Sequence, residues 1–299
     1  MDTKAFYLAL SQRLAEEGSC DVYTDPVSGE KSFSPTADAI HQRLSRRPVI
    51  HLYGGGHVSA ALARVLHGLD FAVTVQDDRP EFVTAERFPH AQLCCGPFEE
   101  LPPFPAGDYA VIMTRGHQGD YLCLRQLLRR KCGYLGMIGS RAKVAATARR
   151  LTEDGFTQDE INSVHSPVGL WIGAKTPAEI AVSIAAQIIE VFRATTRDDL
   201  DSAIVGAITA LESSAVLVSV LEKKGSSPGD VGARMLVGPE GPITGTVGGG
   251  AVEAQAIRQA TALCGGGKPA VVDYDLSNSQ AASLGMICGG HVRMLFECL

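Results

Sequence analysis

The stretch that decides the fold is PVIHLYGGGHVSAAL, residues 48–62. An apolar run is followed by three glycines and then by a helix-like pattern. A strand, a glycine turn and a helix in this order form a cradle for an anion. Glycine lets a phosphate approach the backbone, and the first amides of the helix point at it. The stretch therefore predicts a nucleotide ligand held at Gly54, Gly55 and Gly56.

The spacing of the turn approximates the fingerprint of dinucleotide-binding proteins, with Ser59 in the place of the third glycine. Serine is small enough to keep the helix close to its strand. The fingerprint also requires an acid about 20 residues later, after the next strand. Residues 71–76 read as that strand, and Asp77, Asp78 and Arg79 follow it. This pattern favours a phosphate or ribose site over a structural turn with solvated acids.

The composition is that of a soluble globular protein, with 45% hydrophobic and 20% charged residues in a chain of 299. The net charge of −6 and the lack of a basic run with interleaved aromatics argue against a nucleic-acid partner. No apolar stretch reaches the roughly 18 residues of a membrane span, so we expect no membrane association and a cytoplasmic location. The eight cysteines include no Cys-x-x-Cys pair and are expected to be mostly reduced thiols.

The chain divides into three parts by texture. Residues 47–197 alternate short apolar runs with helical patterns, which predicts a Rossmann-like α/β domain with a doubly wound parallel sheet. Residues 198–299 show strands separated by glycine turns and one helix, which predicts a smaller α+β domain. Residues 1–46 are expected to form an N-terminal extension of a helix, a hairpin and a second helix around residues 37–44.

Two more loops follow predicted strands of the parallel sheet. Ligands of such sheets bind beyond the carboxyl ends of the strands, so both loops lie on the same edge as the glycine turn. The first loop contains Thr114, Arg115 and His117, which suit a phosphate or a polarised ring, although a plain polar loop would have the same composition. The second contains Gly139 and Ser140, and this serine suits a phosphate contact as well as a helix cap.

The smaller domain has glycine-rich turns of its own. Ser226 and Ser227 belong to a turn of hydroxyl and amide donors. The run Gly248, Gly249 and Gly250 lies between a predicted strand and a predicted helix, which repeats the order of the first cradle. This second strand, glycine turn and helix predicts another anion site.

Cys288 precedes two glycines, so a bulky ligand can approach it closely. A thiolate there would bind a soft metal or carry sulfur. A lone cysteine is more often inert, and the spacing alone favours that alternative. The chain contains no His-Glu-x-x-His pair and no Walker loop.

Taken together, these motifs resemble the XdhC/CoxI family of xanthine dehydrogenase accessory factors. In the Rossmann-like block the resemblance rests on Gly55–Val58, Asp77–Arg79, Thr114–His117, Gly139–Arg141, Pro167–Leu170 and Pro177–Ala181. In the smaller domain it rests on Gly225–Pro228, Gly232–Ala233, Gly245–Gly250 and Cys288–Gly290. Members of the family usually carry the smaller domain first, so the domain order is reversed here. Residues 1–45 are left without a family role.

The resemblance implies a maturation chaperone rather than an enzyme with turnover of its own. Such a chaperone binds the molybdenum cofactor and assists its sulfuration by a cysteine desulfurase. It then assists insertion into a client molybdenum hydroxylase of the xanthine dehydrogenase or aldehyde oxidoreductase type. Molybdopterin in a dinucleotide form would suit the glycine turn and His57 directly after it.

The resemblance also implies roles for individual residues. Asp77 or Asp78 would hold a ribose, while Arg115 and His117 would face the pterin phosphate. Cys288 becomes a candidate molybdenum ligand or sulfur relay.

Two alternatives to the chaperone remain open. An NAD(P)-dependent oxidoreductase explains the glycine turn and Asp77, but it gives the smaller domain and Cys288 no role. A non-catalytic nucleotide-sensing module likewise assigns nothing to Cys288. For the oligomeric state, a homodimer is the base-rate expectation.

Overall fold

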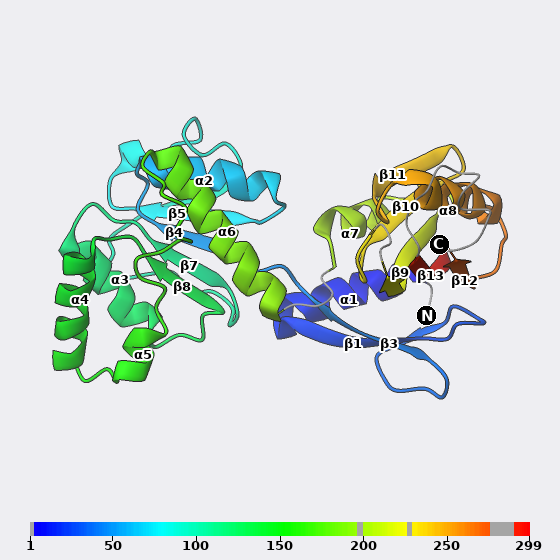
Figure 1. The fold of residues 1–299 in the computed structure, drawn as a ribbon, viewed down its shortest axis with the longest axis horizontal. Coiled ribbons are helices and arrows are strands. Elements are labelled where there is room, and N and C mark those ends of the chain that lie inside the picture. Colours follow the sequence, from blue (N-terminus) through cyan, green and yellow to red (C-terminus); the bar gives the residue numbers. More distant parts are fainter. Residues whose placement is uncertain (1–2, 196–199, 226–228, 276–289) are drawn as a thin grey trace. The chain divides into compact units, whose positions relative to one another are not determined.

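The chain folds into two compact units in the computed structural model, which describes residues 3–195, 200–225, 229–275 and 290–299. Residues 47–195 form one unit, and residues 1–46 form the other together with residues 196–299 (Figure 1). Among the helices described, none combines the length and the apolar character that a membrane span needs.

The unit of residues 47–195 contains a five-stranded sheet in which every neighbouring pair is parallel. The spatial order is β6-β5-β4-β7-β8. The strands are β4 (Ile50–Tyr53), β5 (Val73–Asp77), β6 (Ala91–Cys95), β7 (Tyr109–Ile112) and β8 (Tyr134–Met137). The predicted Rossmann-like fold is therefore confirmed.

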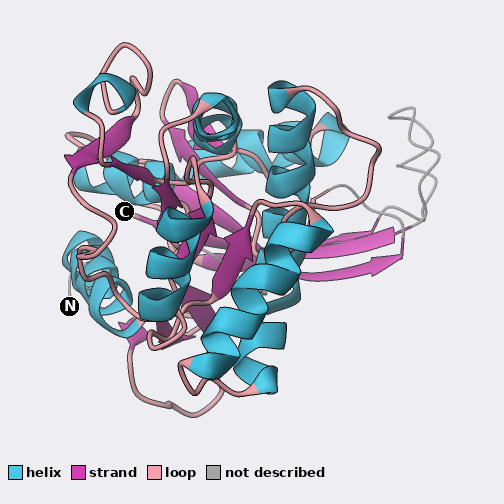
Figure 2. Cartoon of the chain, turned by 90° about the vertical axis from the view of Figure 1, so that its left-hand side faces the viewer, coloured by secondary structure: helices cyan, strands magenta, loops and turns pink. Residues whose placement is uncertain are grey.

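Helices cover both faces of this sheet, as buried parallel strands require. The helices are α2 (His57–Gly68), α3 (His117–Leu127), α4 (Arg141–Glu153), α5 (Gln158–Asn162) and α6 (Pro177–Thr195). Apolar side chains of α2 and α6 share one core with the strands, and those of α3, α4 and α5 share another. In Figure 2, which looks toward this unit, helices stand in front of the magenta strands.

The strand order shows at which edge of the sheet a ligand is expected to bind, and we call this the ligand edge. The chain runs outward from β4 through β5 to β6, then returns to the other side of β4 and continues through β7 to β8. The direction of winding thus reverses between β4 and β7. Loops that leave these two strands at their carboxyl ends diverge there, which opens a crevice at the edge of the sheet.

The second unit contains an antiparallel sheet with the order β11-β10-β9-β13-β12. Its strands are β9 (Val216–Gly225), β10 (Arg234–Gly238), β11 (Gly241–Gly245), β12 (Ala270–Asp275) and β13 (Gly290–Cys298). Helix α8 (Gly250–Leu263) packs on one face, while α7 (Ser202–Thr209) and α1 (Thr3–Glu17) share a core with the other. The unit has the mixed α+β character that the sequence predicts.

Residues 1–46 belong to this second unit. The predicted first helix is present as α1, and β1 (Ser19–Thr24) pairs with the short β2 (Lys31–Ser32). The predicted second helix around residues 37–44 is wrong, because the segment is a strand, β3 (Ile40–Ser45). It pairs antiparallel with the whole of β1. Cross-strand pairing of this kind overrides local helix propensity, which is a weak preference.

One buried ion pair ties the N-terminal segment to the last strand. Lys31 on β2 lies 2.6 Å from the carboxylate of Glu297 on β13, and both side chains are 4% exposed. The Lys31 ammonium also donates to Thr24 at 2.9 Å, and the Tyr7 hydroxyl donates to Glu297 at 3.4 Å. Removal of one partner would leave a buried charge without compensation.

We expect Lys31→Met to lower the free energy of unfolding by about 3–5 kcal/mol, because Glu297 then stays buried without its cation. The double variant Lys31→Met, Glu297→Gln should recover most of that loss. Urea unfolding followed by circular dichroism measures both values. A loss below about 1 kcal/mol for the single variant, as for a surface pair, would contradict this role of the ion pair.

Candidate functional site

The glycine turn joins β4 to α2, and its first two glycines are required by close packing. Gly54 has a φ of 109°, and a Cβ there would lie 2.3 Å from the Met113 carbonyl oxygen. A Cβ on Gly55 would lie 2.3 Å from the Phe82 carbonyl oxygen. These two glycines therefore let the turn fit tightly against its neighbours.

Gly56 differs from the other two glycines. It is the N-cap of α2, and no side chain makes a capping hydrogen bond to the helix. No atom lies within 4 Å of the position that its Cβ would occupy. The first amides of α2 therefore have no side-chain cap, and the partial positive charge of the helix N-terminus favours an anion there.

Ser59 replaces the third glycine of the fingerprint and strengthens the turn. The residue is 0% exposed, and its hydroxyl donates a hydrogen bond to the Gly54 carbonyl. The serine is thus small enough for the helix to lie close to the strand, and its hydrogen bond links the first turn of α2 to Gly54. This contact explains why serine suits a position where the fingerprint has glycine.

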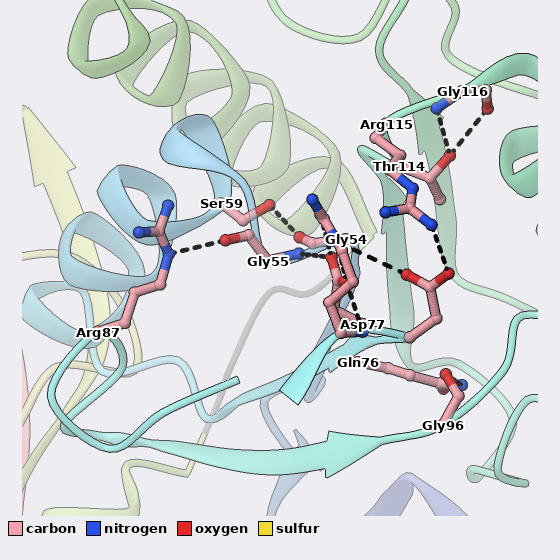
Figure 3. Close-up of polar contacts among 12 residues, drawn as sticks. Gly54, Gly55, Ser59, Gln76, Asp77, Arg87, Gly96, Thr114, Arg115 and Gly116 are labelled. Atoms are coloured by element: carbon pink, nitrogen blue, oxygen red, sulfur yellow. Dashed lines mark hydrogen bonds and ion pairs between the residues drawn. The ribbon is translucent and has the colours of Figure 1, made fainter. Parts of the chain in front are cut away.

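Asp77, at the end of β5, holds the glycine turn through a hydrogen bond to its backbone. Its residue is 1% exposed, and Oδ2 accepts a hydrogen bond of 2.7 Å from the Gly55 amide (Figure 3). Arg79 donates to both carboxylate oxygens, from Nε at 2.8 Å and from Nη2 at 3.0 Å. Burial alone would raise the pKa of Asp77, but the hydrogen bonds from Arg79 and Gly55 lower it below its usual value. Both oxygens of the fingerprint acid are therefore engaged by the protein itself.

Asp78 and Arg115 form an ion pair near the point where the winding of the sheet reverses, between β4 and β7. Asp78 follows β5 and Arg115 follows β7, and β4 with its glycine turn lies between these strands. The Arg115 guanidinium donates to Asp78 Oδ2 at 3.1 Å, with side chains 60% and 33% exposed (Figure 3). An exposed pair of this kind contributes about 0–1 kcal/mol. An anionic ligand at the turn can therefore draw Arg115 away from Asp78 at low cost.

Thr114 has a structural role beside this pair. Its hydroxyl donates to Asp120 Oδ1 at 2.6 Å, and Lys143 of α4 forms an ion pair with the same carboxylate. These contacts tie the end of β7 to α3 and α4. His117 is the exposed first residue of α3, directly after the N-cap Gly116.

Two helices at this edge of the sheet begin with the same pair of residues, a glycine N-cap followed by a histidine. Gly56 and His57 start α2 after β4, and Gly116 and His117 start α3 after the adjacent β7. Neither N-cap makes a side-chain capping bond. The positive ends of both helices therefore lie at the same edge of the sheet.

Ser140 takes the capping role that the sequence left open. Its side chain accepts a hydrogen bond of 3.3 Å from the Lys143 amide at the start of α4. Gly139 lies directly before it, at the end of β8. A third helix therefore starts at the ligand edge, but here a side chain already occupies its first amides.

The second predicted anion site is filled by the chain. Glu253 of α8 accepts hydrogen bonds from the amides of Val247 at 2.9 Å and Gly249 at 3.0 Å, and also from the Thr246 hydroxyl. Burial would raise the pKa of Glu253, but these hydrogen bonds lower it below its usual value. Gly248 and Gly250 share this turn with positive φ values. The turn binds a carboxylate of its own, which leaves Gly54–Gly56 as the open cradle.

Some predicted residues lie outside the part of the chain that the structure describes, namely Ser226, Ser227 and Cys288. Among the described residues, no group of three or more His, Cys, Asp or Glu side chains is placed to hold a metal ion. Sequence reasoning missed Arg87, whose Nε donates to the Gly55 carbonyl at 2.8 Å. It lies in the irregular connection between β5 and β6, where no motif marks it.

Comparison with known proteins now identifies the family. A model described as the XdhC Rossmann domain matches residues 50–188, and a model described as the XdhC and CoxI family matches residues 209–275. Together these two ranges hold more than half of the chain. The chain belongs to the XdhC/CoxI family. Its Rossmann domain precedes the XdhC and CoxI match, in the order that the sequence motifs indicate.

Two curated relatives match about half of this XdhC/CoxI chain. It is 36% identical over 151 residues to "Uncharacterized protein YqeB" of Escherichia coli (strain K12), which covers 48% of this chain and 27% of that protein. It is 34% identical over 163 residues to a protein of Bacillus subtilis (strain 168) named as a probable xanthine dehydrogenase subunit, which covers 53% and 47%. The chain thus spans about a quarter and about half of the length of these relatives.

A solved structure shares the fold. The crystal structure of a protein described as a xanthine dehydrogenase from Bacillus halodurans aligns with a TM-score of 0.52 and 22% sequence identity. The alignment covers 63% of this chain and 64% of that one. At this identity the likeness concerns the fold alone.

Adjacent aspartates give a matched test of the turn. We expect Asp77→Ala to lower the free energy of unfolding by about 2–3 kcal/mol, because Gly55 and Arg79 lose a buried charged acceptor. Asp78→Ala should change it by less than about 0.5 kcal/mol, since Asp78 is exposed. Urea unfolding of the two variants measures the difference, and equal losses would contradict the proposed role of Asp77.

The effect of Asp77 should also depend on pH. Its pKa is lowered in the folded protein. Its contribution to stability is therefore fully present above the unfolded pKa of about 4 and is lost as the pH falls through the folded value. The stability difference between the wild type and Asp77→Ala should shrink in acid, and a difference that grows in acid would contradict this assignment.

Proposed function

We propose that this chain is a xanthine dehydrogenase accessory factor that binds the molybdenum cofactor at the glycine turn and delivers it to a molybdenum hydroxylase. The observation that carries this proposal is the open cradle at Gly56, held by Asp77 and flanked by Arg115. Membership of the XdhC/CoxI family supports the accessory role, as does similarity to a protein named as part of a probable xanthine dehydrogenase.

The residues at the edge of the sheet fit the anionic part of this cofactor. The amides at Gly56 and His57 would receive a phosphate, because helix N-termini with open glycines favour anions. Arg115 would exchange Asp78 for that phosphate, and a bidentate guanidinium contact of this kind is strong. The bound cofactor would supply the molybdenum centre that the client hydroxylase uses.

The state of Asp77 supports a chaperone over a nicotinamide enzyme. In the dinucleotide fingerprint, the acid after the second strand binds the ribose hydroxyls. Here that carboxylate is buried and accepts hydrogen bonds from Gly55 and Arg79. Both oxygens that would bind the ribose of a nicotinamide dinucleotide are therefore already bonded to Gly55 and Arg79.

Sulfur transfer belongs to the same proposal. A cysteine desulfurase would supply the sulfur, and Cys288 would bind molybdenum or relay that sulfur. Among the cysteines that the structure describes, burial raises the pKa of Cys132 to about 11 and also raises the pKa of Cys123 and Cys264. Buried thiols of this kind are poor nucleophiles near neutral pH. Cys288, which lies outside the described residues, is the candidate that the family motif indicates.

Cofactor content tests the binding proposal. Protein purified from a molybdenum-replete host should contain molybdenum and pterin fluorescence in constant ratio to the chain. Arg115→Gln should lower that content about tenfold or more, because it removes a charged hydrogen bond to phosphate. The matched control Arg64→Gln, an exposed arginine on α2, should leave it unchanged. Tight NADH binding without molybdenum or pterin would favour the oxidoreductase alternative instead.

Asp78 gives a prediction of opposite sign. Asp78→Asn removes the acid that competes for Arg115, so cofactor affinity should rise about two- to fivefold. Equilibrium dialysis with released cofactor measures the change. A fall in affinity would show that Asp78 contacts the ligand, as in the ribose prediction.

Cys288→Ala separates sulfur transfer from binding. We expect this variant to keep its molybdenum and pterin content if Cys288 is a sulfur relay, and to lose molybdenum if Cys288 is a ligand. In both cases activation of the client hydroxylase should fall. Full client activation would remove Cys288 from the mechanism.

A further inference from the structure

A cavity lies on one face of the parallel sheet. Its volume is about 220 Å³. Its floor is made by side chains in two rows across three adjacent strands. The first row is His51, Thr74 and Gln92, and the second row is Tyr53, Gln76 and Cys94.

The cavity exists because no helix covers this part of the sheet. The described chain between β5 and β6 contains only a three-residue 3₁₀ turn, η1 (Pro80–Phe82), and the connection from β6 to β7 has no helix. Residues 96–108 cross the face as an irregular loop, and Pro102 and Pro103 line the cavity. A loop with two proline rings cannot fill the space that a helix would occupy.

The polarity of the floor is not required by the fold. Side chains of the same strands that point to the other face are apolar, as in Leu52, Val73 and Val75, each at most 4% exposed. Strands buried in a parallel sheet are normally apolar on both faces. The six floor residues include no aliphatic side chain. A polar floor under an apolar roof indicates a binding site.

Gln76 supplies the observation that points to a ligand. The residue is 4% exposed, and its Nε2 donates to the carbonyls of Pro97 at 2.9 Å and Gly96 at 3.4 Å. These two acceptors fix the orientation of the amide, because a flipped amide would place its oxygen against them. Gln76 Oε1 is buried and has no hydrogen-bond partner among the residues that the structure describes. A buried acceptor of this kind is unfavourable until a donor reaches it.

The first row adds a second acceptor. His51 Nε2 lies 3.3 Å from a carboxylate oxygen of the buried Asp108, and His51 Nδ1 lies 2.7 Å from Thr74 Oγ1. In the tautomer that donates from Nε2 to the carboxylate, Nδ1 accepts the Thr74 hydroxyl proton. The Thr74 oxygen is then an acceptor, about 7 Å along the strand from Gln76.

The donor in the cavity is Tyr53. Burial raises the pKa of its hydroxyl, so it stays protonated at neutral pH. The cavity therefore offers the oxygens of Gln76 and Thr74 as acceptors and the Tyr53 hydroxyl as a donor, and the Gln92 amide adds a further donor and acceptor. Its volume is below the roughly 300 Å³ of pockets for drug-sized ligands, which limits the ligand to a small ring.

We propose that this cavity binds a small uncharged cyclic amide or ureide, whose ring N–H groups donate to Gln76 and Thr74 and whose carbonyl accepts from Tyr53. The proline rings would pack on the flat face of the ring. The site lies within the unit of residues 47–195 and does not depend on the cofactor proposed for the glycine turn.

Two neighbouring cysteines provide the readout. Cys94 lines the cavity, whereas Cys95 points to the other face of β6 and is exposed. In the full-length Cys95→Ser variant, alkylation of Cys94 by iodoacetamide, followed by peptide mass spectrometry, reports occupancy of the cavity. In the Cys94→Ser variant, alkylation of Cys95 reports general accessibility.

Uracil serves as the probe, and 1,3-dimethyluracil is its matched control because it lacks both N–H donors. Uracil at millimolar concentration should at least halve the alkylation rate of Cys94 and leave that of Cys95 unchanged. The dimethyl compound should protect neither. Gln76→Leu should weaken the protection by uracil about tenfold, whereas Gln158→Leu, on the exposed surface of α5, should preserve it.

Equal protection by both compounds, or no protection of Cys94 by uracil, would overturn the proposal and leave water as the occupant of the cavity. The comparison of the two probes needs no Gln76 variant, so it decides the matter even if Gln76→Leu fails to fold.

Discussion

The hydrogen bond from the Gly55 amide to the Asp77 carboxylate is the interaction on which the ligand edge depends. It joins the turn after β4 to the end of β5. Arg79 donates two further hydrogen bonds to the same carboxylate. Asp77 holds Gly55 and Ser59 holds Gly54, while no side chain caps the amides at the start of α2. The acid that the fingerprint assigns to a ligand is thus part of the scaffold, and the ligand is left to Gly56 and Arg115.

The two glycine turns of the chain show what such a turn can bind. The turn before α8 has the same order of strand, glycines and helix, but Glu253 supplies an anion from within the chain. At Gly54–Gly56 the Asp77 carboxylate accepts from the Gly55 amide, whereas the start of α2 has no side-chain cap and a Cβ at Gly56 would meet open space. The contrast supports an external anion at the first turn and a purely structural role for the second. It also fits the proposal that the Rossmann domain holds the cofactor.

Much of this could be predicted from the sequence, because the patterns involved are local. The period of the apolar runs indicated the parallel sheet, and glycine spacing indicated the cradle at Gly54–Gly56. The strand at residues 40–45 was missed because its partner, β1, is distant in sequence and only pairing reveals it. The same limit hid the engagement of Asp77 and the contact of Arg87 with Gly55, since burial and partner choice are properties of the folded chain. The cavity above Gln76 arises from a missing helix, which no motif marks.

The central claim is that an external anion binds at the open end of the Gly54–Gly56 turn. Backbone amide NMR of the full-length protein, titrated with pyrophosphate as a minimal probe, tests it most directly. The account predicts that the largest shifts occur at Gly56, His57 and Val58, that they weaken as salt is added, and that they shrink in Arg115→Gln. Shifts confined to the turn before α8, or no saturable shift at Gly56, would contradict the account.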